Sequence, residues 1–155
     1  MPDNRNAHAG SLRHGRISHP GYAYLVTTAI ADRRPLLADF HTARLLVEEM
    51  REACTAGLIE SLAWVVMPDH LHWLLMLQQG SLSSLMKQIK ARSSRRINQH
   101  LGLAGRLWQP GYHDRAARSD DDLRAMARYI IANPVRAGIV ETVGDYPLWD
   151  AAWLL

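Results

Sequence analysis

The sequence predicts an α+β fold in which a four-stranded antiparallel sheet is backed by helices, followed by one more helix towards the C-terminus. Short runs of β-branched and aromatic residues alternate with longer stretches of helical periodicity. The pair Pro68-Asp69 forms a turn between two such runs, so the second run returns as an antiparallel strand. The resulting order, βαββαβ, is that of the split βαβ (ferredoxin-like) arrangement. A length of 155 residues, 48% of them hydrophobic, suits one domain with its own core.

The first half of the chain supplies the first strand, a helix and a hairpin. Residues 1–20 are a basic arm without hydrophobic periodicity, and residues 21–155 are expected to form the single domain. Gly57 is a suitable end for the first helix. The expected elements are a strand at Tyr22–Ile30, a helix from Asp39 to about Ala56, and strands at Leu58–Met67 and His70–Leu77.

The second half supplies two helices with a short strand between them. One helix starts after Gly80-Ser81 and runs to about Leu101, and a strand is expected at Gly111–Ala117. The last helix has the clearest start, because Ser119 can cap it while Asp122 completes a capping box. It ends at Asn133-Pro134, since a residue before proline avoids the α conformation. The tail, with Trp149 and Trp153, is expected to dock on the domain.

Composition excludes several classes of protein. The single cysteine, Cys54, excludes an intramolecular disulfide framework. The most apolar stretch, Ser61–Leu77, is interrupted by polar residues and is too short to cross a membrane. The N-terminal segment lacks the hydrophobic region of a signal peptide. We therefore expect a soluble, cytoplasmic protein.

The net charge of +3 conceals a strongly basic segment between Ser81 and Arg106, which contains no acidic residue. Such a segment favours a polyanionic partner. Two simpler interpretations stay open: the segment is the solvated face of a helix, and the excess of arginine over lysine reflects a GC-rich genome. The basic residues of this segment are Lys87, Lys90, Arg92, Arg95, Arg96 and Arg106.

His70 and His72 are the most specific chemical signal. They are two positions apart on a predicted strand, so both side chains point to the same face of the sheet. Two adjacent imidazoles suit a divalent metal ion. The alternative is a pair of structural histidines that bond to neighbouring groups. A closed zinc site is disfavoured, because such a site needs four ligands and Cys54 is the only thiol.

Tyr129 and Asn133 are four residues apart around the end of the last predicted helix and share one face of it. Taken alone, a helical tyrosine usually serves packing. Asn133 is also a suitable N-cap for a turn that begins at Pro134. Neither residue indicates chemistry without the histidine pair.

The combination of these motifs resembles the HUH single-tyrosine transposases, and within them the REP-associated tyrosine transposases of bacteria. The resemblance spans roughly residues 20–153. The matching segments are Tyr-Leu-Val-Thr-Thr in the first strand, Met-Pro-Asp-His-Leu-His-Trp-Leu-Leu from Met67, Leu-Trp-Gln-Pro-Gly-Tyr-His-Asp at 107–114, Tyr-Ile-Ile-Ala-Asn-Pro-Val-Arg-Ala-Gly at 129–138, and Asp-Tyr-Pro-Leu-Trp-Asp near the end.

The resemblance implies cleavage of single-stranded DNA at REP-type hairpins. Tyr129 would be the nucleophile and would form a 5′-phosphotyrosine link. His70, His72 and Asn133 would hold Mg²⁺ or Mn²⁺, which polarises the scissile phosphate. Expected DNA contacts are Lys87, Lys90, Arg92, Arg95 and Arg96 on phosphates, with Trp108 and Tyr112 stacking on bases.

Two other functions stay open at this stage. One is a domesticated module that binds hairpin DNA without cleaving it. The other is a hydrolytic metallonuclease that uses water as nucleophile. We expect a monomer, although some single-tyrosine relatives are dimers.

Overall fold

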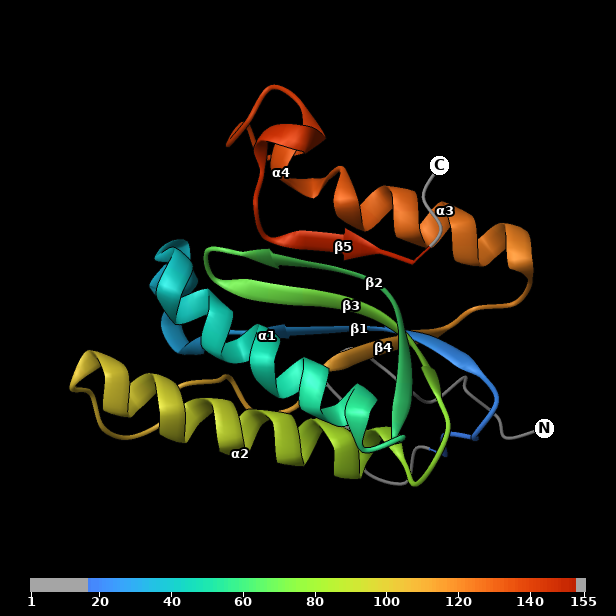
Figure 1. The fold of residues 1–155 in the computed structure, drawn as a ribbon, viewed down its shortest axis with the longest axis horizontal. Coiled ribbons are helices and arrows are strands. Elements are labelled where there is room, and N and C mark those ends of the chain that lie inside the picture. The colour runs from blue at the N-terminus through green and yellow to red at the C-terminus, as the bar shows by residue number, and fades with distance from the viewer. Residues whose placement is uncertain (1–16, 153–155) are drawn as a thin grey trace.

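The chain forms one antiparallel sheet of five strands in the order β4-β1-β3-β2-β5, with helices on both faces (Figure 1). The structure is a computed structural model and describes residues 17–152, so most of the predicted basic arm and Trp153 lie outside the described residues. The strands are β1 (Ala23–Ala29), β2 (Ile59–Met67), β3 (His70–Leu77), β4 (His113–Ala116) and β5 (Trp149–Ala151). The helices are α1 (Phe40–Thr55), α2 (Leu82–Leu101), α3 (Asp120–Ile131) and α4 (Asn133–Arg136), with short 3₁₀ turns at Ala31–Arg33, Leu36–Ala38 and Val143–Asp145.

The predicted ferredoxin-like order is confirmed, and β5 adds one strand to it. The first four strands of the chain have the spatial order β4-β1-β3-β2, and β5 pairs with the outer edge of β2. β5 is only three residues long, which is too short to show the alternation that identifies a strand in a sequence. The predicted docking of the tail takes this form at Trp149, which lies opposite Val65.

Local signals start α1, α2 and α3 where the sequence predicts, whereas α3 ends at Ile131 and Asn133, the residue before Pro134, is itself helical in α4. Asp39, Ser81 and Ser119 cap α1, α2 and α3, each accepting a hydrogen bond from the backbone N–H three residues later. Gly102 ends α2 in the left-handed conformation, with φ of 68°. No helix among residues 17–152 is long and apolar enough to cross a membrane.

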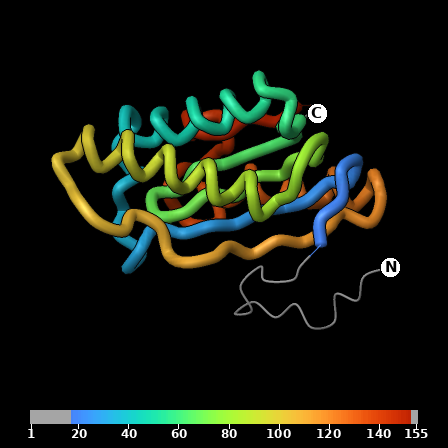
Figure 2. Tube along the Cα trace, turned by 90° about the horizontal axis from the view of Figure 1, so that it is seen from below, coloured from blue at the N-terminus to red at the C-terminus, as the bar shows by residue number. Residues whose placement is uncertain are grey.

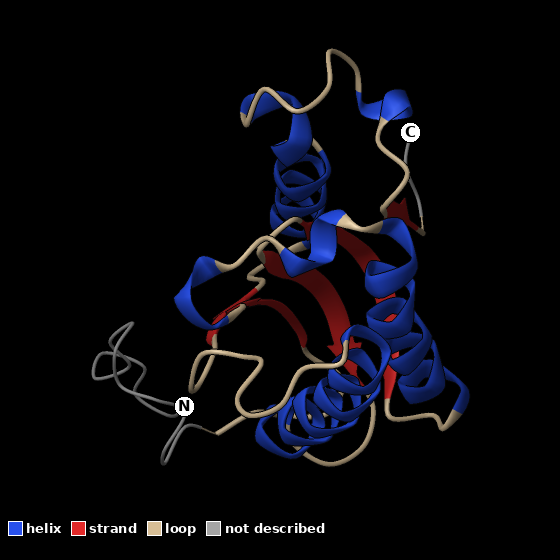
Figure 3. Cartoon of the chain, turned by 90° about the vertical axis from the view of Figure 1, so that its left-hand side faces the viewer, coloured by secondary structure: helices blue, strands red, loops and turns tan. Residues whose placement is uncertain are grey.

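The two faces of the sheet carry different layers. α1 and α2 lie side by side over one face (Figure 2), where the Trp73 indole donates a hydrogen bond to Ser61 beside α1. α3 packs over the opposite face, against β2, β3 and β5. Met76 of β3 lies beside Leu123 and Ala127 of α3 on that face. Figure 3 shows the sheet between these helical layers.

The alternation along β3 assigns His70 and His72 to a face. Leu71 and Trp73 are fully buried and point towards α1 and α2. His70, His72 and Met76 therefore point to the face on which α3 lies. The histidine pair and the predicted tyrosine helix thus share one side of the sheet.

Candidate metal and tyrosine site

The two imidazoles of β3 face each other. Nε2 of His70 lies 3.2 Å from Nε2 of His72, and the ring centroids are 4.7 Å apart at an interplanar angle of 84°. Both side chains are partly buried at the end of β3 next to the β2–β3 turn. The arrangement brings two ring nitrogens to one point at the surface of the sheet.

The opposite nitrogen of each ring is held by another side chain. Asp69 Oδ1 lies 2.7 Å from His70 Nδ1, and Thr27 Oγ1 lies 2.8 Å from His72 Nδ1. Arg33 Nε donates to the other oxygen of Asp69 at 2.8 Å. An ionised carboxylate only accepts, so Asp69 places the proton of His70 on Nδ1 and leaves the Nε2 lone pair available.

The Thr27 hydroxyl suits His72 in either tautomer. With the Nδ1 atom of His70 protonated, the contact between the two Nε2 atoms requires His72 to donate from Nε2 and to accept at Nδ1. A hydroxyl both donates and accepts, so Thr27 can also accept from His72 Nδ1 once that ring turns its Nε2 lone pair outwards. Thr27 therefore supports both arrangements without moving.

The electrostatic surroundings keep His72 neutral. Burial, followed by Coulombic effects of His70, Arg136 and Arg33, lowers the pKa of His72 to about 4. For Asp69, burial alone would raise the pKa, but hydrogen bonds from His70 and Arg33 outweigh it and the pKa is lowered. At neutral pH the site thus contains a neutral imidazole beside an ionised, fully partnered carboxylate.

The donor set fits a divalent cation. Two nitrogen ligands at about 2.1 Å from one ion lie about 3.0–3.4 Å apart for octahedral to tetrahedral angles, and the two Nε2 atoms are 3.2 Å apart. Within residues 17–152 there is no group of three or more His, Cys, Asp or Glu side chains that could hold a metal. Any further protein ligand from this part of the chain must therefore be another residue type, such as an amide.

Tyr129 points away from the core. The buried face of α3 consists of Met126, Ala127, Ile130 and Ile131, whereas the Tyr129 residue is 61% exposed. A packing tyrosine would bury its ring, so the structure gives no support to a packing role. Figure 1 shows the C-terminal end of α3 on the same side of the molecule as the β2–β3 turn.

Asn133 does not act as a helix cap. It is the first residue of α4, and the preceding Ala132 is the cap position, without a side-chain hydrogen bond. Its amide oxygen instead accepts a hydrogen bond from Arg136 Nη2 at 3.1 Å. The side chain of Asn133 is thus turned towards Arg136, and its oxygen keeps one lone pair for another partner.

Arg136 joins Tyr129 to Asn133 and was not among the predicted site residues. Its Nη2 donates to the backbone oxygen of Tyr129 at 2.6 Å, and its Cζ lies 3.8 Å from the centroid of the Tyr129 ring. Its charge also contributes to the low pKa of His72. Its position three residues after Asn133 could have identified it, but the sequence analysis assigned roles only to Tyr129 and Asn133 in this segment.

The predicted DNA contacts on α2 divide into tethered and exposed residues. Arg92 Nε lies 2.6 Å from Glu49 Oε1, and Arg96 reaches both Glu49, at 3.0 Å, and Glu48, at 2.6 Å. These ion pairs join α2 to α1. Lys87 and Arg95 are exposed on the surface of α2.

Lys90 and Trp108 have structural partners. Lys90 Nζ donates to the backbone oxygens of Gln109 and Gly111, and burial lowers its pKa to about 8. Trp108 is 3% exposed, and its indole donates to the Ser93 hydroxyl. No face of that ring is open to a base, so the stacking role expected for Trp108 is dropped. Tyr112 is partly buried against the core.

The basic residues of α2 and the histidine pair lie on opposite sides of the sheet. α2 covers the face to which Trp73 points, and His70 and His72 point to the other. The structure thus brings His70 and His72 together, groups Tyr129 with Asn133, and leaves the α2 residues across the sheet.

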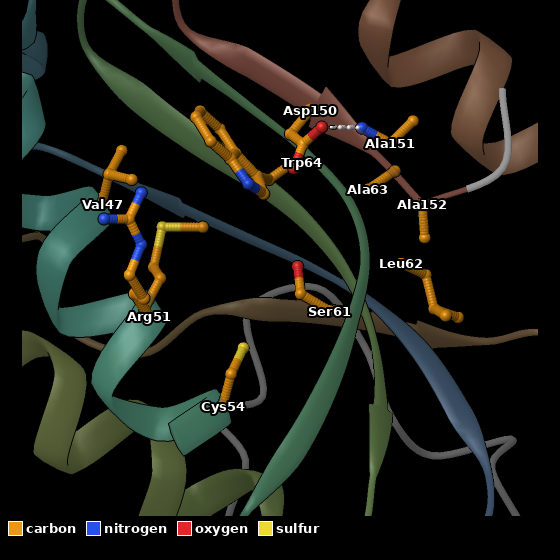
Figure 4. A pocket seen from close by; sticks show the side chains of 11 residues that line it. Val47, Arg51, Cys54, Ser61, Leu62, Ala63, Trp64, Asp150, Ala151 and Ala152 are labelled. Atoms are coloured by element: carbon orange, nitrogen blue, oxygen red, sulfur yellow. Dashed lines mark hydrogen bonds between the residues drawn. The ribbon is translucent and has the colours of Figure 1, made fainter. Parts of the chain in front are cut away.

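A hollow on the α1 side of the sheet is lined by no pair of histidines like His70 and His72. It has a volume of about 220 Å³ and lies between α1 and β2 (Figure 4). Cys54, Arg51 and Ser61 line it together with Asp150. Burial raises the pKa of the Cys54 thiol, which keeps it protonated and weakly nucleophilic.

Comparisons with known proteins agree with this geometry. The family model described as "Transposase IS200 like" matches residues 19–133. A REP-associated tyrosine transposase of Escherichia coli K12 is 37% identical over 87 residues, which are 55% of this chain and 50% of that protein. The solved structure of a REP-associated tyrosine transposase bound to a REP hairpin superposes with a TM-score of 0.72 at 29% identity, covering 86% of this chain and 79% of that one. The chain thus matches half the length of the E. coli relative.

Proposed function

We propose, from the premise that this chain belongs to the family of IS200-like transposases, that it cleaves and rejoins single-stranded DNA at REP-type hairpins through a 5′-phosphotyrosine intermediate. The observation that supports the proposal best is the histidine pair, whose two Nε2 atoms lie 3.2 Å apart on the side of the sheet that carries the exposed Tyr129. The proposal of a hairpin as substrate rests on the superposed relative, whose structure was solved bound to a REP hairpin.

His70, His72 and Asn133 are the proposed holders of Mg²⁺ or Mn²⁺. Bound there, the ion would polarise the scissile phosphate and offset the charge that builds on its oxygens. Asp69 and Thr27 fix the two imidazoles from behind, so the ligands are arranged before any ion binds. The Asn133 oxygen has a free lone pair beside its bond from Arg136.

Tyr129 is the proposed nucleophile. Its phenol oxygen forms a bond to phosphorus and gives up its proton, while the bond from phosphorus to the 3′ oxygen breaks and that oxygen leaves as a hydroxyl. The reverse attack by a 3′-hydroxyl releases Tyr129 and joins two strands without ATP. Arg136 holds the Tyr129 ring and the Asn133 amide in one arrangement and brings positive charge to the place where phosphate charge builds.

The adduct assay tests this function. Purified protein with Mn²⁺ and a single-stranded hairpin oligonucleotide is expected to form a covalent complex that survives denaturing electrophoresis. Tyr129→Phe should abolish it, whereas Tyr22→Phe, which changes another exposed tyrosine, should leave it unchanged. An undiminished adduct from Tyr129→Phe would contradict the assignment of the nucleophile.

The same gel separates the alternatives. His70→Ala and His72→Ala should lose cleavage while keeping hairpin affinity. Cleavage without an adduct would indicate a hydrolytic nuclease, and binding without cleavage under any metal would indicate a non-catalytic module. Sedimentation of the purified protein tests the accompanying proposal of a monomer.

A further inference from the structure

Among residues 17–152, the helix on the histidine-bearing face covers mainly one half of it. α3 packs against β2, β3 and β5, which form one side of that face. The other side consists of β1 and the edge strand β4. On β4, His113 is exposed, and the Arg115 side chain is 64% exposed.

The register places these two side chains beside the histidine pair. Thr27 lies opposite His72 on one flank and opposite His113 on the other, so the three form one row across β3, β1 and β4. Directly paired residues point to the same face, and the Thr27 hydroxyl indeed reaches His72. Since neighbouring strands are about 4.8 Å apart, the backbone of His113 is about 10 Å from that of His72.

Arg115 is the next residue of β4 that points to the same face as His113. It lies two residues after His113 and is therefore on the same face. Its partner is Asp122 at 3.7 Å, a separation near the limit of an ion pair, and the Arg115 end of this pair is open to solvent. The guanidinium can exchange this carboxylate for a stronger anion at little cost.

Positive charge also lies at the end of this row of side chains that is nearest to the histidine pair. Arg33 and Arg136 both act on His72. Arg33 pairs with the Asp69 carboxylate, whereas Arg136 bonds neutral groups, the Tyr129 carbonyl and the Asn133 amide. The row therefore presents donors and cations from the edge of the sheet up to the histidine pair, which suits a chain of phosphates.

We infer that His113 and Arg115, which we name the β4 strip and which the register sets beside Thr27, bind the backbone of the unpaired DNA segment that leads to the histidine pair. This inference rests on the proposed function and identifies where its substrate lies. The His70 side chain is only 15% exposed, so a phosphate must come close to the surface of the sheet to contact it. A flexible single strand can approach that closely more readily than a duplex. The basic face of α2, across the sheet, is the competing surface.

Binding to unpaired DNA tests the inference without any cleavage. Fluorescence anisotropy with a labelled single-stranded oligonucleotide is measured in the Tyr129→Phe background, with EDTA present. Arg115→Glu should weaken binding about tenfold at low salt, and Arg115→Gln should reduce the slope of log K against log salt by about 0.7, the value for one lost phosphate contact on a single strand. His113→Ala should weaken binding several-fold.

The controls use arginines on the other side of the sheet. Arg51→Glu on α1 makes the same charge change at an exposed position outside the strip and should shift affinity less than twofold. Equal losses from Arg51→Glu and Arg115→Glu would reduce the effect to net charge and overturn the inference. A loss from Arg95→Glu with Arg115→Glu unchanged would move the strand to α2 and overturn it too.

Two further controls distinguish a loss of DNA binding from a loss of folding or of catalysis. Thermal melting of each variant identifies a misfolded protein, and Arg115→Gln, which only removes charge, serves in place of Arg115→Glu if the latter does not fold. Because the assay omits metal and the nucleophile, failure of the adduct assay would refute the proposed chemistry while leaving the location of the strand measurable.

Discussion

Replacing Asp69 by asparagine should weaken metal binding about 10–100-fold. The Asp69 carboxylate serves two donors at once, His70 Nδ1 at 2.7 Å and Arg33 Nε at 2.8 Å. An asparagine side chain has one oxygen and one NH₂ group, so it can accept from one of these donors but turns an N–H towards the other. Losing the partner that orients a histidine ligand typically costs 10–100-fold in metal affinity.

That range corresponds to about 1.4–2.7 kcal/mol of binding free energy. It agrees with the net value of one hydrogen bond to a charged group, about 1.5–3 kcal/mol. Titration calorimetry with Mn²⁺ at neutral pH measures the change directly, and ¹⁵N spectra of the histidine rings report whether His70 still carries its proton on Nδ1. The matched control is Asp121→Asn, whose side chain is 98% exposed.

Equal Mn²⁺ affinities of Asp69→Asn and the parent protein would refute this reasoning. Such a result would mean that the His70 ring is held by packing alone and that the carboxylate has no effect on the ligand. A loss of affinity accompanied by a lower melting temperature would instead indicate damage to the turn. The calorimetric comparison is therefore made only on variants with the melting temperature of the parent.

Three further expectations concern the rest of the site and the scaffold. Arg136→Ala should slow adduct formation about tenfold in single-turnover assays, since about 1–2 kcal/mol of ring and hydrogen-bond contact is lost, with Arg136→Lys partly restoring the rate. Chelation by EDTA should abolish the adduct, and added Mn²⁺ should restore it; an adduct formed in EDTA would exclude a metal requirement. Glu49→Ala should lower the free energy of unfolding by about 2 kcal/mol, and Tm by about 4–8 °C, with Glu60→Ala as the control.

The Glu49 effect also has a defined pH dependence. Burial alone would raise the pKa of Glu49, but its hydrogen bonds to Arg92 and Arg96 outweigh burial and lower it. A group whose pKa is lower in the folded state stabilises the fold above its unfolded value, near 4.3, and loses that effect as pH falls through the folded value. The difference between Glu49→Ala and the parent should therefore shrink in strongly acidic buffer.

The main elements of the fold could be predicted because local signals and the global arrangement agree. Each long helix has a capping side chain that the sequence displays, and the hairpin turn at Pro68-Asp69 fixes the pairing of β2 with β3. β5 escaped prediction because its three residues become a strand only through the free edge of β2.

The site was predictable only in part, for a related reason. The spacing of His70 and His72 identifies them as a pair in the sequence. Thr27 and His113 lie beside them only because of the strand register, which a sequence does not display. The basic residues of α2 show the opposite error. Their acidic partners, Glu48 and Glu49, lie more than 40 positions earlier, so a segment that contains no acid in sequence is partly neutralised in space.

The placement of the two histidines on a central strand explains how one small sheet can serve both structure and chemistry. Alternate residues of β3 point to opposite faces, so Leu71 and Trp73 anchor the strand in the core while His70 and His72 remain at the surface. In their proposed role as ligands, the two histidines are held by a strand whose alternate residues are anchored in the core, which a loop would not provide. Tyr129, the proposed nucleophile, has the opposite requirement, because its hydroxyl must reach a phosphate outside the core, and its exposed position on α3 meets that requirement.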